Sequence, residues 1–351
     1  MLMTRKRHDR GQRDYMFRVS AERPARLMER RPEYQPTPAR DMRALADDLG
    51  IDRLWLKDES QRMELGSFKA LGGGFAVAQM ISDAASGEDP DSEAGRRAAA
   101  TMTFITASAG NHGLSVATGA RRFGAKAVIV LPSSAPEAFE ERIRRTGAEV
   151  QRLKGTYEES VSFATEQADR HGWLLLADGS WKGYVDRPAL VMEGYTVIAE
   201  ECRAEFDHSN KWPSHVFLQA GVGGFAGAIS AHIRSFWKQQ PTIVVVEPDR
   251  APCLLRSIEN GTLTRADGPL SNMGRLDCKD ASLIAFDTLE TDADCFTTIT
   301  DDEAEKASQQ LAEAGIATTP SGAASFAALA RFDAGPESRC LAFITEGPEA
   351  R

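Results

Sequence analysis

The stretch of sequence that decides the fold is Val216-Phe217-Leu218-Gln219-Ala220-Gly221-Val222-Gly223-Gly224-Phe225-Ala226-Gly227. Its apolar run predicts a buried strand, and the glycine-rich loop that follows opens a predicted helix from Ala226 to Trp237. Glycines let the backbone approach a ligand closely, and the start of a helix favours negative charge. The loop at 221–227 is therefore predicted to bind a phosphate.

The same alternation of apolar strands and amphipathic helices runs through most of the chain. It predicts the α/β class, with parallel sheets covered by helices on both faces. The polar residues 82–98 are expected to form a surface loop. A further predicted helix spans Leu114 to Phe123, and the other predicted strands are Leu54–Leu56, Met102–Thr106, Ala127–Leu131, Ile243–Val246 and Leu341–Thr345.

The overall composition narrows the function classes. The chain has 351 residues, 42% hydrophobic and 26% charged, which suits one large or two medium domains. A net charge of −9 argues against nucleic acid or an anionic membrane as the main partner, although residues 5–10 form a short basic run, expected to be a terminal arm. No apolar run approaches membrane-spanning length.

The five cysteines are scattered and odd in number, without a Cys-x-x-Cys pair. This spacing predicts reduced thiols in a cytoplasmic protein, and it argues against a disulfide framework and a zinc site. The histidines are equally dispersed, so we expect no metal.

A second informative stretch is Gly66-Ser67-Phe68-Lys69-Ala70-Leu71-Gly72-Gly73-Gly74, in which no carboxylate lies within two positions of Lys69. Loss of water lowers the pKa of an amine from about 10.4, and a neutral amine is a nucleophile that forms a Schiff base with an aldehyde. Lys69 is therefore a candidate nucleophile. An ordinary helix lysine with its head in water is the alternative interpretation.

The loop Ser108-Ala109-Gly110-Asn111-His112-Gly113 lies between a predicted strand and a predicted helix. Backbone N–H groups at such a helix start face an anion, and the amide of Asn111 both donates and accepts hydrogen bonds. A tight turn without a ligand remains the alternative.

Asp178 follows an apolar run and lies beside aromatic residues, so it is a candidate acid or base. An aspartate that forms only a local turn is the alternative, because Asp-Gly pairs are common in turns.

The glycine loop also fits a dinucleotide fingerprint. Gly221-x-Gly223-x-x-Ala226 has the required spacing, and Glu247 ends the next predicted strand, where an acid that binds a ribose would lie. An NAD-binding domain would leave Lys69 and the Asn111 loop without a function.

An amine nucleophile, an amide at a helix start and a separate phosphate loop together describe pyridoxal 5′-phosphate. The stretches around Lys69, Asn111 and the glycine loop resemble those of the fold-type II pyridoxal-phosphate enzymes, which include serine/threonine dehydratases and the tryptophan synthase β subunit. The chain most resembles diaminopropionate ammonia-lyase, in consistent order along the stretches Tyr34–Pro38, Leu56–Arg62, Phe68–Gly73, Asp178 with Gly183-Tyr184, Gln219–Gly223, Val246–Asp249, Ser321–Ala323 and Thr345–Gly347.

This resemblance implies a role for each matching residue. Lys69 would hold the cofactor as a Schiff base and then move protons, and Asp178 would act in proton abstraction. Asn111 would bind the phenolic oxygen of the cofactor. The substrate carboxylate would be held near Ser108, Ala109 and Asn111, and the remaining cofactor-binding residues would be Gly221, Val222, Gly223, Gly224, Phe225 and Thr345.

Two positions depart from the resemblance. The ammonia-lyases carry an aspartate where this sequence has Ala109, at a position associated with the D-substrate, so the choice between D- and L-substrates stays open. Thr319 stands where many dehydratases have an acid that holds a divalent cation, which is a second reason to expect no metal.

The sequence thus predicts a two-domain fold-type II enzyme, with a large domain from residues 1–100 and 186–351 and a small domain from 101–185. We expect β-elimination from 2,3-diaminopropionate to pyruvate and ammonia, in amino-acid catabolism, by a cytoplasmic homodimer with no nucleic-acid or membrane partner. A serine, threonine or hydroxyaspartate dehydratase is the alternative. An NAD-dependent oxidoreductase and a non-catalytic amino-acid sensor are more remote ones.

Overall fold

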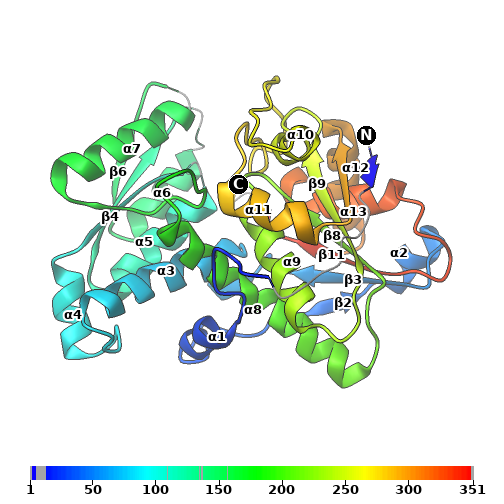
Figure 1. The fold of residues 1–351 in the computed structure, drawn as a ribbon, viewed down its shortest axis with the longest axis horizontal. Helices are drawn as coiled ribbons and strands as arrows, with labels where there is room; N and C mark the ends of the chain where they lie inside the picture. The colour runs from blue at the N-terminus through cyan, green and yellow to red at the C-terminus, as the bar shows by residue number, and fades with distance from the viewer. Residues whose placement is uncertain are drawn as a thin grey trace.

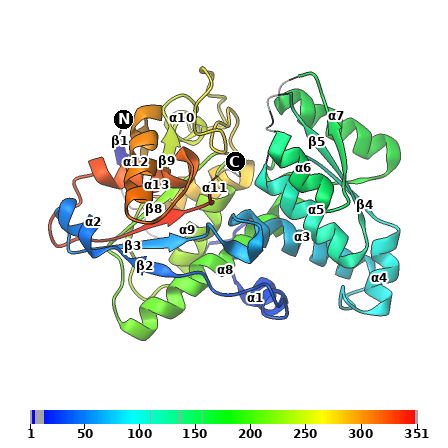
Figure 2. The ribbon, with the colours of Figure 1, turned by 180° about the vertical axis from the view of Figure 1, so that it is seen from behind.

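The computed structural model describes residues 2–4, 13–108, 110–133, 135, 137–155 and 157–348. Its two sheets lie at opposite ends of the longest axis, as Figure 1 shows, and Figure 2 gives the same arrangement from behind. The basic run at 5–10 and Ala109 lie outside the described residues.

The larger sheet has seven strands among the described residues. Its inner pairs are parallel, and the two edge strands pair antiparallel with their neighbours. In spatial order the strands are β1 (Leu2–Thr4), β10 (Cys295–Ile299), β9 (Thr242–Pro248), β8 (His215–Gln219), β11 (Arg339–Ile344), β3 (Arg53–Asp58) and β2 (Ala39–Asp41).

The smaller sheet is parallel throughout its described part. All its strands lie between Thr103 and Leu175, which supports the predicted small domain, although the domain boundaries stay a prediction. The order is β6 (Glu149–Arg152), β5 (Lys126–Leu131), β4 (Thr103–Ala107) and β7 (Leu174–Leu175). The predicted strands therefore all correspond to observed ones, and the α/β class is confirmed.

Helices cover both sheets. Those nearest the predicted site are α3 (Lys69–Ala84), α5 (Asn111–Phe123), α8 (Asp186–Ser209) and α9 (Gly224–Phe236). The others are α1 (Glu22–Met28), α2 (Arg43–Asp48), the 3₁₀ helix η1 (Arg62–Glu64), α4 (Glu93–Ala100), α6 (Glu137–Arg145), α7 (Tyr157–His171), α10 (Cys253–Asn260), α11 (Leu283–Asp292), α12 (Asp301–Glu313) and α13 (Pro320–Arg331).

Successive residues of the central strands point to opposite faces of the larger sheet. Leu218 and Val245 join the apolar cluster that includes α8, α9 and α11. Phe217 and Val244, their neighbours in sequence, join the cluster that includes α12 and α13. Both faces are therefore buried, which explains why these strands read as continuous apolar runs.

The expectation of a surface loop at residues 82–98 is wrong. Helix α3 continues to Ala84, and α4 begins at Glu93, so only residues 85–92 lie outside the helices. Ser92 explains the start of α4, because its hydroxyl accepts a hydrogen bond from the Gly95 amide and so caps the helix. The second half of α4 is rich in alanine, which favours a helix over a loop.

Helices α3 and α8 cross in very close contact at two glycines. A Cβ added at Gly72 would lie 2.7 Å from the Val191 carbonyl oxygen, and one at Gly194 would lie 2.7 Å from the Gly72 Cα. Both distances are shorter than Cβ atoms allow, so only glycine fits at either position. The crossing lies one helical turn after Lys69.

A buried network of charges connects β3, η1 and α8. The Glu201 carboxylate accepts hydrogen bonds from Lys57 Nζ at 2.6 Å and from Arg62 Nη2 at 2.7 Å. Arg62 also pairs with Glu59, and both of these side chains are fully buried. Buried charges persist only when they are paired in this way, so the network fixes how α8 packs against the larger sheet.

Replacing Glu201 with glutamine is expected to destabilise the protein by about 3–5 kcal/mol at neutral pH, because two buried cations would lose a partner. Burial raises the pKa of Glu201, but Lys57 and Arg62 outweigh burial and hold that pKa below its ordinary value. The stabilisation is thus present above about pH 4.3 and is lost as the pH falls below it. Apparent melting temperatures between pH 7 and pH 3 measure this effect, and the variant should show a smaller drop on acidification.

Glu205→Gln is the matched control, since Glu205 lies one turn further along α8 and is exposed. It should melt like the wild type at pH 7. An E201Q protein that melts at the wild-type temperature would show that the network contributes no stability.

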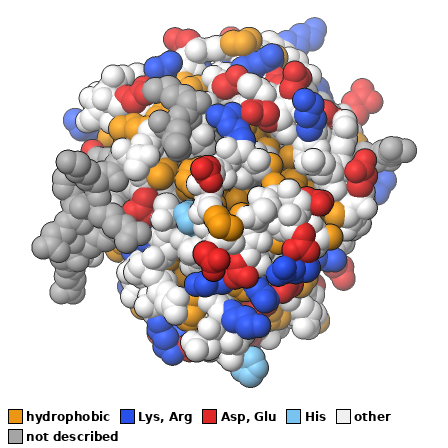
Figure 3. All heavy atoms as spheres, turned by 90° about the vertical axis from the view of Figure 1, so that its right-hand side faces the viewer, with side chains coloured by type: hydrophobic (Ala, Val, Ile, Leu, Met, Phe, Trp, Pro, Cys, Tyr) orange, Lys and Arg blue, Asp and Glu red, His pale blue; other side chains and the backbone are white. Residues whose placement is uncertain are grey.

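Charged side chains on the side of the molecule where α2 lies are paired with one another. Arg43 pairs with Asp47 at 2.9 Å, and Arg53 pairs with Asp41 at 2.5 Å. Figure 3 shows acidic and basic side chains intermixed on this side. Such exposed pairs contribute about 0–1 kcal/mol each, so the surface pairs here matter less for stability than the buried Glu201 network.

Two further features of the described residues bear on the expectations above. All five cysteines are free thiols. None of the described helices is both long enough and apolar enough to cross a membrane.

Candidate active site

Lys69 is the first residue of α3, and the end of β11 holds this helix start in place. The Phe68 N–H donates to the Thr345 carbonyl at 3.2 Å, and Ser67 forms an isolated antiparallel bridge with Glu346. Lys69 therefore lies at the carboxyl end of the larger sheet, where ligands bind in parallel sheets.

Asp178 is the ionic partner of Lys69. The Lys69 ammonium donates to Asp178 Oδ2, from a residue 109 positions away in the chain. Both side chains are only partly buried, with exposed fractions of 20% for Lys69 and 15% for Asp178. The structure thus brings together the two residues that the sequence nominated separately for amine and acid–base chemistry.

The expectation of a neutral amine at Lys69 is wrong. Burial lowers the pKa of Lys69, as expected, but the Asp178 carboxylate outweighs burial and the net pKa is raised. Burial raises the pKa of Asp178, but Lys69 and, next, His112 together have the larger effect. The pKa of Asp178 therefore lies below its ordinary value. The pair is therefore an ammonium and a carboxylate at neutral pH.

Three side chains near this pair carried no signal in the sequence. Burial and the Asp178 charge raise the pKa of the Cys278 thiol to about 12. The same two causes raise the pKa of the Tyr157 phenol, at the start of α7. Tyr195, from α8, is buried beside Lys69. Burial raises the pKa of the Tyr195 phenol, and the opposing effect of Lys69 is smaller. No motif surrounds these residues, so only the fold reveals them.

The glycine loop lies next to the backbone of Asp178. A Cβ added at Gly224 would lie 3.6 Å from the Asp178 carbonyl oxygen. Gly223 has φ of 99°, a left-handed conformation that favours glycine, and helix α9 begins directly after it with no side-chain cap. Uncapped N–H groups at a helix start bind anions, so the geometry suits the predicted phosphate.

Three other residues of this loop have contacts near the site. A Cβ at Gly221 would lie 2.9 Å from Cys278 Sγ, so glycine is needed for the close approach. The Phe225 ring packs on the Phe68 ring, with centroids 4.7 Å apart. The Val222 carbonyl accepts a hydrogen bond from the Ser282 amide.

The Asn111 loop lies at the start of α5 and faces the end of β11. Asn111 Nδ2 donates to the buried carboxylate of Glu346, which also accepts from Thr319 Oγ1. Ser108 Oγ accepts from the amides of Gly110 and Gly113, so it shapes its own loop. Glu346 is a site residue that the sequence analysis did not single out, although it lies within the matching stretch Thr345–Gly347.

Thr345 lies at the end of β11 and is buried. Its hydroxyl accepts from Gln219 Nε2 at 3.2 Å, which ties it to the strand that precedes the glycine loop. Its predicted contact with the cofactor stays a prediction.

Glu247 has a structural role that accounts for its position near the end of β9. Its carboxyl oxygens accept hydrogen bonds from the Leu254 and Leu255 amides at 2.7 and 2.8 Å, at the start of α10. Glu247 thus binds the amides at the start of α10. The dinucleotide interpretation, which required Glu247 to bind a ribose, therefore loses its acidic residue.

The described residues fit pyridoxal phosphate. Lys69 supplies an amine and the start of α9 supplies uncapped N–H groups, as a phosphate-bearing aldehyde requires. The Tyr195 hydroxyl and Gln219 Oε1 are buried without a hydrogen-bond partner in the described part of the protein. Buried polar atoms of this kind need a partner, and a polar cofactor supplies one.

Within the described residues no group of three or more His, Cys, Asp or Glu side chains could hold a metal ion. Thr319 caps α13, because its hydroxyl accepts from the Gly322 amide while donating to Glu346.

Comparisons with known proteins point to one family. A family model described as "Pyridoxal-phosphate dependent enzyme" matches residues 30–346. The diaminopropionate ammonia-lyase of Escherichia coli (strain K12) is 32% identical over 277 residues, which cover 76% of this chain and 69% of that protein. The crystal structure of diaminopropionate ammonia lyase from E. coli in complex with D-serine has a TM-score of 0.89 and 27% identity, and covers 99% of this chain and 93% of that one.

A second E. coli structure, of the enzyme in complex with an aminoacrylate-PLP azomethine reaction intermediate, has a TM-score of 0.87 and 28% identity over the same shares of the two chains. These matches confirm the fold-type II architecture, the pyridoxal phosphate cofactor and the lyase class that the sequence predicted. The chain therefore belongs to the pyridoxal-phosphate-dependent enzymes of fold type II and, among them, to the diaminopropionate ammonia-lyase family.

Proposed function

We propose that this protein eliminates the β-amino group of 2,3-diaminopropionate, with pyridoxal phosphate as cofactor. The observation that carries the proposal is the ion pair between Lys69 and Asp178, whose backbone lies next to the uncapped start of α9. The reaction consumes one water and yields pyruvate and two molecules of ammonia, so its atoms balance without an oxidant or a metal.

In this proposal each of the following residues has its own role in binding the cofactor. Lys69 binds the cofactor. The loop residues Gly221, Val222 and Gly223, together with Gly224 and Phe225 at the start of α9, bind its phosphate. Asn111 and Thr345 orient it from the other side. Bound pyridoxal phosphate supplies a ring that accepts the electron pair left when the substrate loses its Cα proton.

Proton transfer falls to Lys69 and Asp178. With the cofactor and substrate bound, the free Lys69 amine would accept the Cα proton. The Asp178 carboxylate then stabilises the ammonium that results, since the two side chains already form an ion pair. The same proton on Lys69 is available to the departing β-amino group.

The loop at Ser108, Ala109 and Asn111 binds the substrate carboxylate in this proposal. Ala109 stands where the ammonia-lyases carry an aspartate, so the preferred enantiomer is decided by assay rather than by the resemblance. The E. coli relative was crystallised with D-serine, which makes D-amino acids part of the test.

The test is a substrate panel assayed for release of 2-oxo acid and ammonia. It contains the L- and D-forms of 2,3-diaminopropionate, serine, threonine and hydroxyaspartate. We expect diaminopropionate to react with the highest kcat/KM and to give two ammonia per pyruvate. A hydroxyamino acid that reacts faster would make the protein a dehydratase, and no turnover of any member would make it a non-catalytic relative.

We infer also that the enzyme is a homodimer in the cytoplasm. Five free thiols without a disulfide are typical of a reducing compartment, which supports the location. The resemblance to fold-type II enzymes supports the dimer. Light scattering on the purified holoenzyme measures the mass directly, and a value near 38 kDa, the mass of one chain, would exclude the dimer.

A further inference from the structure

Glu346 is a buried acid in the wall of a cavity of about 240 Å³ beside the Asn111 loop. It is the second residue after β11 ends, and the proposed reaction gives its carboxylate no role. Burying a carboxylate costs stability unless its neighbours compensate. The contacts of Glu346 therefore indicate what this acid does at the site.

The two carboxylate oxygens of Glu346 have different partners. Oε1 accepts a hydrogen bond from Thr319 Oγ1, and Oε2 accepts one from Asn111 Nδ2. Arg275 Nε lies 3.7 Å from Oε2, so the acid also has a cationic neighbour. Asn111 is thus bound by a carboxylate that is itself held from two further directions.

The backbone of Glu346 is held against the loop that precedes Lys69. Glu346 forms the isolated antiparallel bridge with Ser67, and the Gly347 amide donates to the Gly66 carbonyl at 2.9 Å. Because Lys69 is the first residue of α3, these contacts also fix Glu346 relative to the residue that binds the cofactor.

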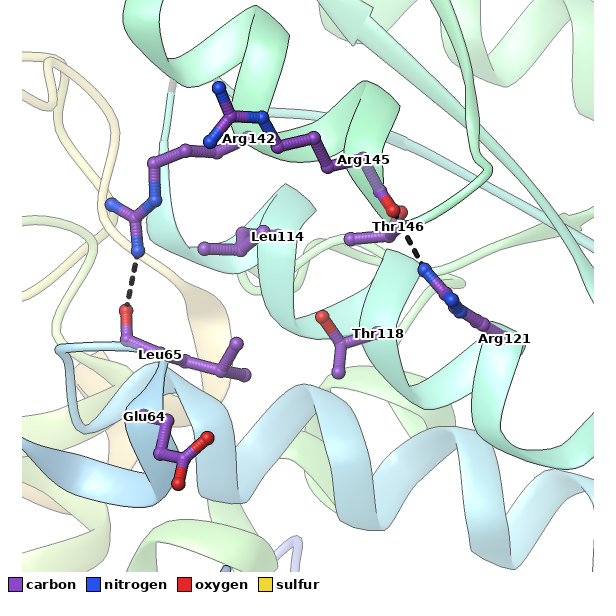
Figure 4. Close-up of a pocket in the computed structure, with 8 residues that line it drawn as sticks. All are labelled: Glu64, Leu65, Leu114, Thr118, Arg121, Arg142, Arg145 and Thr146. Atoms are coloured by element: carbon purple, nitrogen blue, oxygen red, sulfur yellow. Dashed lines mark hydrogen bonds between the residues drawn. The ribbon is translucent and has the colours of Figure 1, made fainter.

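The same loop is held from α6. Arg142 Nη2 donates to the Leu65 carbonyl at 2.9 Å, a hydrogen bond that Figure 4 shows. Met63 and Glu64, just before Leu65, have φ of 49° and 59°, in the left-handed region that non-glycine residues rarely adopt. Contacts such as that of Arg142 keep the loop in this conformation, and the loop in turn holds Glu346.

Glu346 determines which way the Asn111 amide points. A carboxylate only accepts hydrogen bonds, whereas a primary amide has two N–H donors on one side and an accepting oxygen on the other. With the amide reversed, its oxygen would face the carboxylate, and two acceptors would meet without a hydrogen between them. Glu346 therefore selects the orientation in which Nδ2 faces it, and the second N–H of Nδ2 stays available for another acceptor.

We propose that Glu346 is a positioning residue for Asn111 and directs the second N–H of its amide to the phenolic oxygen of pyridoxal phosphate. That oxygen is an acceptor, so it needs a donor and would be repelled by the amide oxygen. Thr319 stands where many dehydratases have an acid, and here its hydroxyl donates to Glu346 where a second carboxylate would repel it. The inference rests on the proposed function, in which Asn111 contacts the cofactor.

The experiment measures the dissociation constant of pyridoxal phosphate, by adding it back to cofactor-free protein and recording the absorbance of the bound cofactor. Asn111→Ala should weaken binding by about 10-fold, the loss expected for one hydrogen bond. Glu346→Gln should weaken it by about 3- to 10-fold, because a glutamine accepts either orientation of the Asn111 amide. The double variant should bind no more weakly than Asn111→Ala alone, since Glu346 acts through Asn111.

The absorbance maximum of the bound cofactor separates positioning from packing. In Glu346→Gln it should move toward the maximum of Asn111→Ala, because both variants lack a fixed donor at the phenolic oxygen. Glu337→Gln is the matched control, since Glu337 is exposed and lies just before β11. It should keep the wild-type dissociation constant and absorbance maximum.

If Glu346→Gln fails to fold, the exchanged pair Asn111→Asp with Glu346→Gln decides the question. It restores one amide and one carboxylate at the contact, so the protein should fold and melt near the wild-type temperature. It should not recover cofactor affinity, because an aspartate at position 111 donates no hydrogen bond. Wild-type affinity in the exchanged pair would mean that the contact only packs the loop.

Two further results would overturn the role of Glu346. One is a loss of affinity in the double variant that equals the product of the two single losses. The other is an absorbance maximum that stays at the wild-type wavelength in Glu346→Gln. Unchanged cofactor binding in Asn111→Ala would refute the contact of Asn111 with the cofactor and, with it, the role of Glu346. A protein that meets these expectations but releases no pyruvate from diaminopropionate would refute the lyase activity and leave the role of Glu346 standing.

Discussion

Lys69→Ala is expected to lower turnover of diaminopropionate by at least about 10³-fold, because it removes both the amine that binds the cofactor and the group that moves the substrate proton. The visible absorbance band of the bound cofactor should disappear at the same time. Stopped assays of pyruvate release and an absorbance spectrum of the purified variant measure the two effects.

Lys69→Arg is the informative control for this variant. Arginine keeps a positive charge beside Asp178 but forms no Schiff base, so it separates the role of Lys69 as an ionic partner from its role as a nucleophile. We expect the arginine variant to melt near the wild-type temperature and to be as inactive as the alanine variant. Wild-type turnover in Lys69→Arg would mean that the amine serves the structure only.

Asp178→Asn is expected to lower kcat by about 10²- to 10⁴-fold while cofactor affinity changes little. The carboxylate raises the pKa of Lys69 in the wild type, so its removal lets burial dominate and lowers that pKa. The acidic limb of the pH–rate profile should therefore move toward lower pH. Initial rates between pH 5 and pH 10, with a parallel titration of the cofactor, measure both changes.

Asp186→Asn serves as the control for this variant, since Asp186 is the first residue of α8 and its side chain is exposed. It should keep wild-type rates. An unchanged kcat in Asp178→Asn would leave Asp178 as a turn residue with an incidental ionic partner.

The elements that the sequence predicted correctly are those with a strong local pattern. The strands β8 and β9 are continuous apolar runs because helices bury both faces of the larger sheet, and the glycine loop marks the start of α9. The helix α4 was missed because a polar, proline-containing segment precedes it, and the capping hydrogen bond from Gly95 to Ser92 depends on local geometry rather than on apolar periodicity.

The candidate site was predictable only where a motif carries it. Lys69, Asn111 and the glycine loop each belong to one, and the structure brings them to one end of the larger sheet. The charge of Lys69 was not predictable, because its partner Asp178 lies 109 positions away.

The crossing of α3 and α8 at Gly72 and Gly194 has a consequence for the chemistry. Lys69 lies one turn before Gly72, so the contact between Gly72 and Gly194 sets where the start of α3 lies against α8. A methyl group at either glycine would push the two helices apart and would move the backbone that carries Lys69. The size of the side chain at these two positions therefore affects the placement of the Lys69 amine as well as the packing of the helices.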